Sequence, residues 1–447
     1  MKALPLVLLA AAAAVTPVWR VQVLPMQLTN GEGARKYLPA TMPGGLAVFD
    51  FDGDGLLDLF FTNGGELPDG AKTQPLHANR LFRNLGGLRF ADVTARSGLA
   101  GTGYDFGVAA ADYDADGQPD LLVTGLRGVT LWRNRGDGSF ENTTAQAGLD
   151  NHGRWSVAAA WFDKDNDGDL DLFVTNYVTW SAAAERECLV NGKPDFCHPR
   201  HYQPAPGALF ENRGNGTFAD VSEASGIAAH PGKGMSPAAA DFDGNGFTDL
   251  FVTNDRAFNF LFLNIDGKRF EESAFAWNVA APRDGNPVSG MGADAQDMDN
   301  DGRPDLLYTA LRDEMRLFPS IETPARRSTK SPHPRGWACS RARWPVGAWR
   351  WPISTMTAGR ISPSHGATHC LPLEAMAARP RSRPPGSAIW ATENSRRAMD
   401  GSTCREKCTV ASWPRISTTM DAWTLCSRPC TRSRAFFAIL VRPGKIG

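Results

Sequence analysis

Residues 50–58 read Asp50-Phe51-Asp52-Gly53-Asp54-Gly55-Leu56-Leu57-Asp58, an instance of the pattern Asp-x-Asp-x-Asp/Asn-Gly-x-x-Asp. The pattern occurs five times, and its copies begin at Asp50, Asp112, Asp163, Asp241 and Asp297. The starts are 62, 51, 78 and 56 residues apart. Each copy follows a small apolar stretch and precedes a strand-like run such as Leu121-Leu122-Val123-Thr124. Recurrence at this spacing indicates a repeat protein.

A second signature, Leu-x-x-Asn followed closely by Gly and Phe, accompanies the first four copies. It occurs at Leu81–Asn84, Leu131–Asn134, Leu209–Asn212 and Leu261–Asn264. The turn signals between apolar runs predict four short strands in each unit. Repeated groups of four strands are typical of propeller blades, so the sequence predicts an all-β fold.

The acidic pattern predicts calcium loops. Carboxylates at alternate positions of a tight loop can all turn inward, and glycine at the sixth position permits a sharp bend. Oxygen donors without Cys or His suit Ca²⁺. Asp and Gly are also ordinary turn residues, but five copies in one register favour a metal. The candidate ligands are Asp50, Asp52, Asp54, Asp58, Asp112, Asp114, Asp116, Asp120, Asp163, Asp165, Asp167, Asp171, Asp241, Asp243, Asn245, Asp249, Asp297, Asp299, Asp301 and Asp305.

These units resemble FG-GAP repeats of the VCBS type, as in the propellers of integrin α-chains. The segment from Thr41 to Asp50 is similar to the opening of bacterial proteins related to cartilage acidic protein. The resemblance covers residues 28–318, where five blades are recognisable. It implies a seven-bladed β-propeller with Ca²⁺ in its loops, usually exported and used for binding or adhesion. The UnbV domain that often follows in such bacterial relatives is not recognisable here.

Cys188 and Cys197 bracket a short loop in the third unit, and in an exported chain they predict a disulfide. A zinc site formed with His198 and His201 is the alternative. No Gly-x-Ser-x-Gly motif or other catalytic constellation appears, so the prediction is a binding module without enzyme activity. An extracellular hydrolase or lyase that uses the propeller as a scaffold, or a cell-surface assembly factor, remains the alternative.

The start of the chain predicts export. Met1-Lys2 is followed by an apolar run to Val15 that contains Ala12-Ala13-Ala14, which favours a signal peptide at residues 1–16 over a buried helix. The run is too short to cross a bilayer, so we expect a secreted, periplasmic or cell-surface protein that is not an integral membrane protein. Its partner would be an extracellular protein or glycan. Residues 1–318 carry 26 basic and 42 acidic residues, which argues against nucleic-acid binding.

Residues 319–447 differ in kind, because they hold 21 basic and 6 acidic residues and none of the repeat pattern. The genetic code supplies an explanation. Reading the codons one base earlier allows Asp-x-Asp-x-Asp-Gly-x-x-Asp at 353–361, and the shifted codon after Met356 must encode Asp. A similar window lies at 416–424. Together with the five visible copies, the two shifted windows would give seven copies of the pattern at similar spacing. We therefore predict a frameshift near Phe318, and a tail without a native fold that includes Cys404, Cys408, Cys426 and Cys430.

Overall fold

The computed structural model describes residues 20–42, 44–282, 284–298, 300–311, 314–318, 423–430 and 434–441. For residues 20–22, 314–318 and the two C-terminal segments the description covers the backbone alone. The expected signal peptide at residues 1–16 lies outside the described residues, as does most of the tail. No helix in the described part is long and apolar enough to cross a membrane.

Four antiparallel sheets of four strands follow one another along the chain, and a fifth sheet has three described strands. Blade 1 consists of β2 (Leu46–Phe49), β3 (Asp58–Phe61), β4 (Arg80–Asn84) and β5 (Phe90–Asp92). Blade 2 consists of β6 (Asp105–Ala111), β7 (Asp120–Gly125), β8 (Gly128–Asn134) and β9 (Phe140–Asn142). Blade 3 consists of β10 (Ser156–Phe162), β11 (Asp171–Asn176), β15 (Ala208–Asn212) and β16 (Phe218–Asp220). Blade 4 consists of β18 (Gly234–Ala240), β19 (Asp249–Asn254), β20 (Phe260–Asn264) and β21 (Phe270–Glu272), and blade 5 of β22 (Gly290–Gln296), β23 (Asp305–Ala310) and β24 (Glu314–Phe318).

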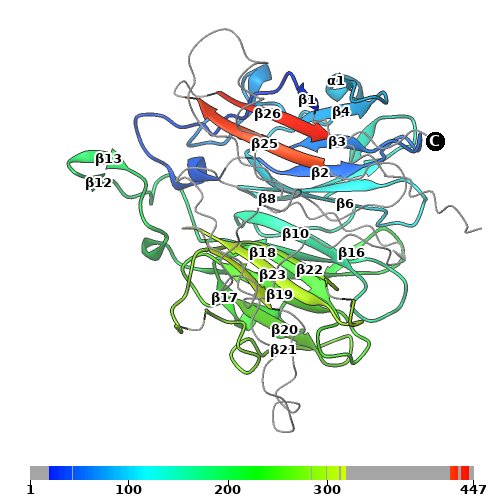
Figure 1. Cartoon of the computed structure of the whole chain (residues 1–447), viewed down its shortest axis with the longest axis vertical. Coiled ribbons are helices and arrows are strands. Elements are labelled where there is room, and N and C mark those ends of the chain that lie inside the picture. Colours follow the sequence, from blue (N-terminus) through cyan, green and yellow to red (C-terminus); the bar gives the residue numbers. More distant parts are fainter. Residues whose placement is uncertain are drawn as a thin grey trace, which may run out of the picture.

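The blades stack in chain order through their first strands. β2 contacts β6, β6 contacts β10, β10 contacts β18 and β18 contacts β22. Figure 1 shows the blue strands of blade 1 at one end, followed by blades 2 and 3 and then by blades 4 and 5, which overlap in this view. The all-β class and the propeller-type blades predicted from the sequence are confirmed.

The second strand of each blade explains why the blades stack. β11 and β19 both read Asp-Leu-Phe-Val-Thr-Asn, and all six residues of each strand are buried. A strand buried on both faces reads as a continuous apolar run, and here each face meets a neighbouring blade. The core accordingly lies between blades: Phe173 of blade 3 packs in one cluster with Leu250 and Phe262 of blade 4.

A threonine of the second strand and the asparagine of the Leu-x-x-Asn signature join one blade to the next. Thr124 Oγ1 of blade 2 donates to the carbonyl oxygen of Val157 in blade 3, at 2.8 Å. Asn134 Nδ2 of blade 2 donates to the carbonyl oxygen of Phe51 in the loop of blade 1, also at 2.8 Å. Such bonds pair buried backbone groups at positions where the sheet ladder cannot reach them.

Blade 3 carries an insertion between its second and third strands. The insertion contains the hairpin β12 (Cys188–Val190) and β13 (Lys193–Asp195), which projects at one edge of the molecule (Figure 1). A further strand, β14 (Ala205–Pro206), pairs with β17 (Pro231–Gly232). Helical structure in the described part is confined to α1 (Thr94–Ser97) and to 3-10 turns at Leu38–Thr41, Pro75–His77, Pro199–His201 and Ile227–Ala229.

The described part of the tail contains two strands. β25 (Trp423–Cys430) and β26 (Arg434–Val441) form an antiparallel hairpin, and β26 pairs with β1 (Arg20–Val23). This hairpin is a small part of residues 319–447, and the absence of a native fold in the tail stays a prediction. The remainder of residues 319–447 lies outside the described residues, including Cys404 and Cys408.

Candidate metal-binding loops

The acidic loops connect the first strand of each blade to its second. In four loops, one oxygen each from the carboxylates at positions one, three and nine lies within 4.8 Å of the other two. The groups are Asp50, Asp52 and Asp58; Asp112, Asp114 and Asp120; Asp163, Asp165 and Asp171; and Asp241, Asp243 and Asp249. Residues predicted from the spacing alone are therefore brought together in four blades.

The first position of each loop organises the loop backbone. In blade 1, Asp50 accepts hydrogen bonds from the backbone N–H groups of Asp54 and Gly55, at 3.1 and 2.7 Å. Gly55 has φ +83°, and a Cβ atom there would meet no atom within 4 Å. The left-handed backbone, and not the available space, therefore requires glycine at the sixth position.

The fifth position does not join the three converging carboxylates. In loop 1, Asp54 Oδ1 accepts from the backbone N–H of Leu56 at 2.9 Å, and Asp116 and Asp167 make the same contact in loops 2 and 3. Asn245 does so in loop 4. Positions one, three and nine therefore converge, while one oxygen of the fifth position caps the turn; its role as a fourth ligand stays a prediction.

The ninth-position carboxylates are buried at the start of the second strand. Asp58 has no exposed surface, and its oxygens accept from the backbone N–H groups of Asn84 and Phe51, at 2.7 and 3.1 Å. Burial raises the pKa of Asp58, Asp171 and Asp249 to about 7 and that of Asp120 to about 8. A nearby divalent cation would favour the ionised carboxylates and offset the free-energy cost of burying their charge.

Basic side chains lie beside the third-position carboxylate of loops 1, 2 and 3, a feature that the repeat pattern did not predict. Arg83 Nε lies 2.6 Å from Asp52 Oδ2, Arg133 Nε lies 2.7 Å from Asp114 Oδ2, and Lys164 Nζ lies 2.6 Å from Asp165 Oδ2. The sequence does contain a signal for two of these bases, because Arg83 and Arg133 each come directly before the Asn of the second signature.

The fifth loop is described in part, because Asp299 lies outside the described residues. Asp297 accepts from the N–H groups of Asp301 and Gly302 at 3.1 and 2.9 Å. Asp305 accepts from the N–H of Met298 at 2.8 Å. These bonds repeat those of loop 1.

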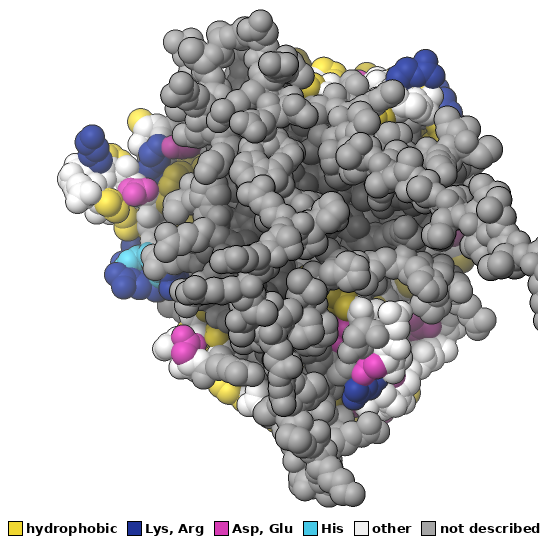
Figure 2. Space-filling view, viewed as in Figure 1, with side chains coloured by type: hydrophobic (Ala, Val, Ile, Leu, Met, Phe, Trp, Pro, Cys, Tyr) yellow, Lys and Arg dark blue, Asp and Glu magenta, His cyan; other side chains and the backbone are white. Residues whose placement is uncertain are grey.

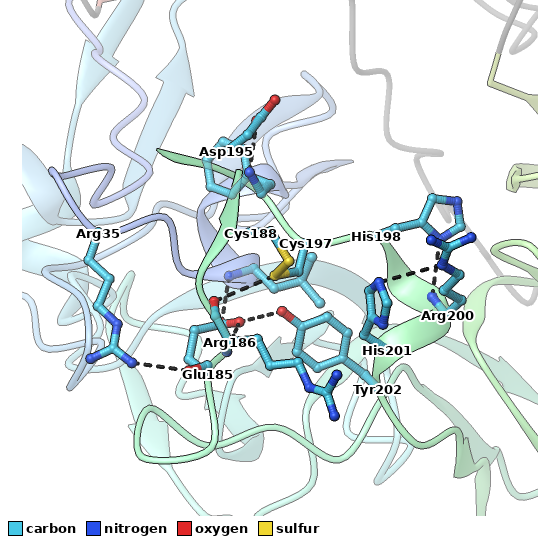
Figure 3. Close-up of a disulfide and its surroundings, with 12 residues drawn as sticks. Arg35, Glu185, Arg186, Cys188, Asp195, Cys197, His198, Arg200, His201 and Tyr202 are labelled. Carbon is cyan, nitrogen blue, oxygen red and sulfur yellow. Dashed lines mark hydrogen bonds between the residues drawn. A yellow bond between two sulfur atoms is a disulfide. The ribbon is translucent and has the colours of Figure 1, made fainter. Parts of the chain in front are cut away.

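The insertion of blade 3 is held by a disulfide and a buried carboxylate (Figure 3). The sulfur atoms of Cys188 and Cys197 are 1.99 Å apart, so neither is present as a thiolate for zinc. Glu185, which is 6% exposed, accepts from Leu38 N at 3.0 Å, from Trp180 Nε1 at 2.6 Å and from Tyr202 Oη. This carboxylate therefore fastens the insertion to the N-terminal segment.

The two histidines of the zinc alternative lie at the base of this insertion. His198 Nδ1 accepts from Arg200 N at 3.2 Å, and His201 Nε2 accepts from Arg200 Nε at 3.4 Å. Figure 2 shows dark blue and cyan side chains gathered at the same edge of the molecule. His198 therefore contacts the backbone of Arg200, and His201 contacts its guanidinium.

Two buried carboxylates at the other end of the strands tie neighbouring blades together. Asp105 of blade 2 accepts from Asn79 Nδ2 at 2.8 Å and lies 3.4 Å from Lys72 Nζ. Asp255, directly after blade 4's second strand, accepts from Tyr177 Oη at 2.6 Å. Burial raises the pKa of Asp105 and lowers that of Lys72. Both acids thus have partners across a blade interface.

Comparison with known proteins places these loops in a family. A model described as FG-GAP-like repeat matches residues 50–123, 114–174, 191–252 and 241–308. The chain is 23% identical to cartilage acidic protein 1 of Mus musculus over 272 residues, which is 59% of this chain and 38% of that protein. Identity to the Homo sapiens protein is 26% over 250 residues, covering 47% and 37%. The chain thus spans 37% to 38% of the length of these relatives.

Solved structures give weaker likenesses. An Agrocybe aegerita lectin that recognises non-reducing terminal N-acetylglucosamine has a TM-score of 0.34 at 18% identity, covering 60% of this chain and 61% of that one. The V. cholerae biofilm matrix protein Bap1 has a TM-score of 0.34 at 14% identity, covering 68% and 42%. The family assignment comes from the repeat model, which matches more than half of the chain: this protein belongs to the FG-GAP-like repeat family.

Proposed function

We propose that this chain is an exported, calcium-binding β-propeller repeat protein that acts as a binding or adhesion module for an extracellular protein or glycan. The observation that carries the proposal is the convergence of three carboxylates in each of four loops. Membership of a repeat family supports the binding role, and the disulfide supports an oxidising compartment.

The donor chemistry of the loops fits calcium. All three converging groups are carboxylates, and hard oxygen donors suit Ca²⁺ better than the softer metals that prefer Cys or His. Asp52 Oδ1, Asp114 Oδ1 and Asp165 Oδ1 are buried and have no hydrogen-bond partner, so each has a lone pair available. An unpaired buried carboxylate oxygen is costly, and a bound cation removes that cost.

Bound calcium would stabilise the loop that connects the first and second strands of a blade. Positions one and three lie in the loop, whereas position nine begins the second strand, so an ion held by all three would fix the loop to the blade. Because Asn134 Nδ2 donates to the carbonyl oxygen of Phe51 in loop 1, an ordered loop would also stabilise the contact between blades 1 and 2.

Thermal unfolding in calcium and in chelator tests the proposal. Calcium that binds only the folded chain raises the melting temperature, and one site contributes about 2.7 kcal/mol when the free ion is at 100 times its dissociation constant. Extracellular calcium modules bind at about 10⁻⁴ to 10⁻³ M, so the titration should run from about 10⁻⁵ to 10⁻² M. An equal concentration of Mg²⁺ should give a smaller shift, because Mg²⁺ demands a smaller octahedral site.

The double variant Asp50→Asn and Asp52→Asn should remove one loop's share of the calcium-dependent shift. The matched control is Asp69→Asn, at an exposed acid outside the loops. Equal midpoints for the wild-type chain in calcium and in chelator would show that the loops are turns and not ion sites.

A further inference from the structure

The carboxylate at the third position has the same asymmetric surroundings in loops 1, 2 and 3. One oxygen, Oδ2 of Asp52, Asp114 or Asp165, lies 2.6 to 2.7 Å from a basic nitrogen. The other oxygen, Oδ1, is buried in all three residues and has no hydrogen-bond partner. In each of the three loops, therefore, one oxygen of this carboxylate is in an ion pair and the other has no hydrogen-bond partner in the protein.

In blades 1 and 2 the base comes from the third strand and also reaches the fifth position. Arg83 Nη2 lies 3.0 Å from Asp54 Oδ2, and Arg133 Nη2 lies 3.0 Å from Asp116 Oδ2. Each guanidinium therefore forms ion pairs with two loop carboxylates.

Blade 3 reaches the same arrangement with its charges exchanged. Glu211 occupies the strand position of Arg83 and Arg133, and the base is Lys164, within the loop itself. Lys164 Nζ lies 2.6 Å from Asp165 Oδ2 and 2.9 Å from Glu211 Oε2, and its side chain is only 2% exposed. The third-position carboxylate of blade 3 therefore also contacts a basic side chain, but this one comes from the loop and not from the third strand.

Blade 4 lacks this arrangement. Leu263 stands at the strand position and Phe242 at the position of Lys164. Asp243 instead accepts from Asn245, with Oδ1 3.0 Å from the backbone nitrogen and Oδ2 3.3 Å from Nδ2. Both oxygens of Asp243 therefore accept hydrogen bonds from Asn245, in place of the basic side chain found in loops 1 to 3.

We propose that Arg83, Arg133 and Lys164 are positioning residues, which hold one oxygen of the third-position carboxylate so that the other stays available to the bound cation. This inference rests on the calcium binding proposed above. It predicts two classes of site, in which loops 1 to 3 bind more tightly than loop 4. Groups that orient metal ligands contribute about 10-fold to 100-fold in metal affinity when they are removed.

The sign of the effect separates positioning from simple charge. A base near the site repels a divalent cation, so if charge alone mattered, removing the base would tighten binding. If the base orients the carboxylate, removing it weakens binding. Arg83→Gln and Arg133→Gln test this at two loops, and Arg83→Lys keeps the charge and a donor of the kind that Lys164 supplies in loop 3.

The experiment is a calcium titration of the full chain against a chromophoric chelator, with the melting temperature measured in chelator and in calcium. Arg83→Gln and Arg133→Gln should each weaken one site by about 10-fold or more. Arg83→Lys should recover most of that loss. The control is Arg89→Gln, an exposed base of the same blade that donates to the carbonyl oxygens of Gly86 and Leu85 and should leave binding unchanged.

The outcomes are distinguishable. Unchanged melting in chelator with weaker calcium binding supports positioning, because a merely structural contact would lower the metal-free melting temperature instead. Wild-type or tighter binding by both Arg→Gln variants would overturn the inference and leave the proposed function standing. A wild-type chain that takes up no calcium would overturn the proposed function itself.

Discussion

At the scale of single residues, the ninth-position carboxyls set the response of the metal-free protein to pH. Burial raises their pKa to about 7 or 8, above the ordinary value of about 3.9 in an unfolded chain. Between these values the folded state binds protons that the unfolded state does not, so stability falls as pH rises from about 4 to 8. In chelator, the melting temperature should therefore rise when the pH is lowered from 8 to 5.5.

Calcium should weaken or reverse this trend, because the ion binds the ionised carboxylates and competes with protons. Melting curves at several pH values, with and without calcium, make the comparison. A metal-free midpoint that falls steadily as the pH is lowered over this range would contradict the argument.

The residues of the loops were predictable in part. The spacing of Asp50, Asp52 and Asp58 is local, and a tight turn brings such positions together whatever the rest of the chain does. The bases were not predictable, because Arg83 reaches loop 1 from a strand 29 positions after Asp54. In blade 3 the base and acid are exchanged, so no single sequence position marks the contact.

At the scale of elements, the signature Asn determines how blades are joined. Asn134 Nδ2 donates to Pro119 O within its blade and to Phe51 O in blade 1, at 3.1 and 2.8 Å. Asn84 Nδ2 donates to Leu57 O within its own blade, at 2.9 Å. Asn134 therefore makes a hydrogen bond to the neighbouring blade in addition to the bond within its own blade that both residues make.

Asn134→Ala should destabilise the chain more than Asn84→Ala does. The difference should be about 1 to 3 kcal/mol, because the buried carbonyl of Phe51 loses its side-chain donor. Urea unfolding of the two variants measures this difference, and both should bind calcium in the remaining loops. Equal losses of stability would mean that the bond between blades 1 and 2 contributes nothing.

The strands and loops of each blade could be predicted because their signals are short and repeated: an apolar run, an Asp-Gly turn, and the Leu-x-x-Asn signature. The blade 3 insertion could not. Its position depends on Glu185, which accepts from Leu38, 147 residues away, and no local pattern announces such a contact. The cysteines indicated a disulfide but not the surface on which the loop packs.

At the scale of the whole molecule, the composition of the sequence changes at one point. Blades 1 to 4 each have four strands, and blade 5 has three described strands, the last of which ends at Phe318. The acidic composition and the repeat pattern end at the same residue. A frameshift at that position would account for this change in the sequence, because residues 319–447 would then be read in another frame.

DNA sequencing of codons 310–330 from the source organism tests this explanation. We expect one inserted or missing base relative to the present sequence. The restored frame should then encode loops starting at 353 and 416, which lie 56 and 63 residues beyond the previous starts and would make seven in all. The restored chain should unfold at a higher temperature, because each added blade buries an apolar face that is otherwise left open. A confirmed sequence without a base change, together with unchanged melting of blades 1 to 5 in a chain engineered in the shifted frame, would contradict it.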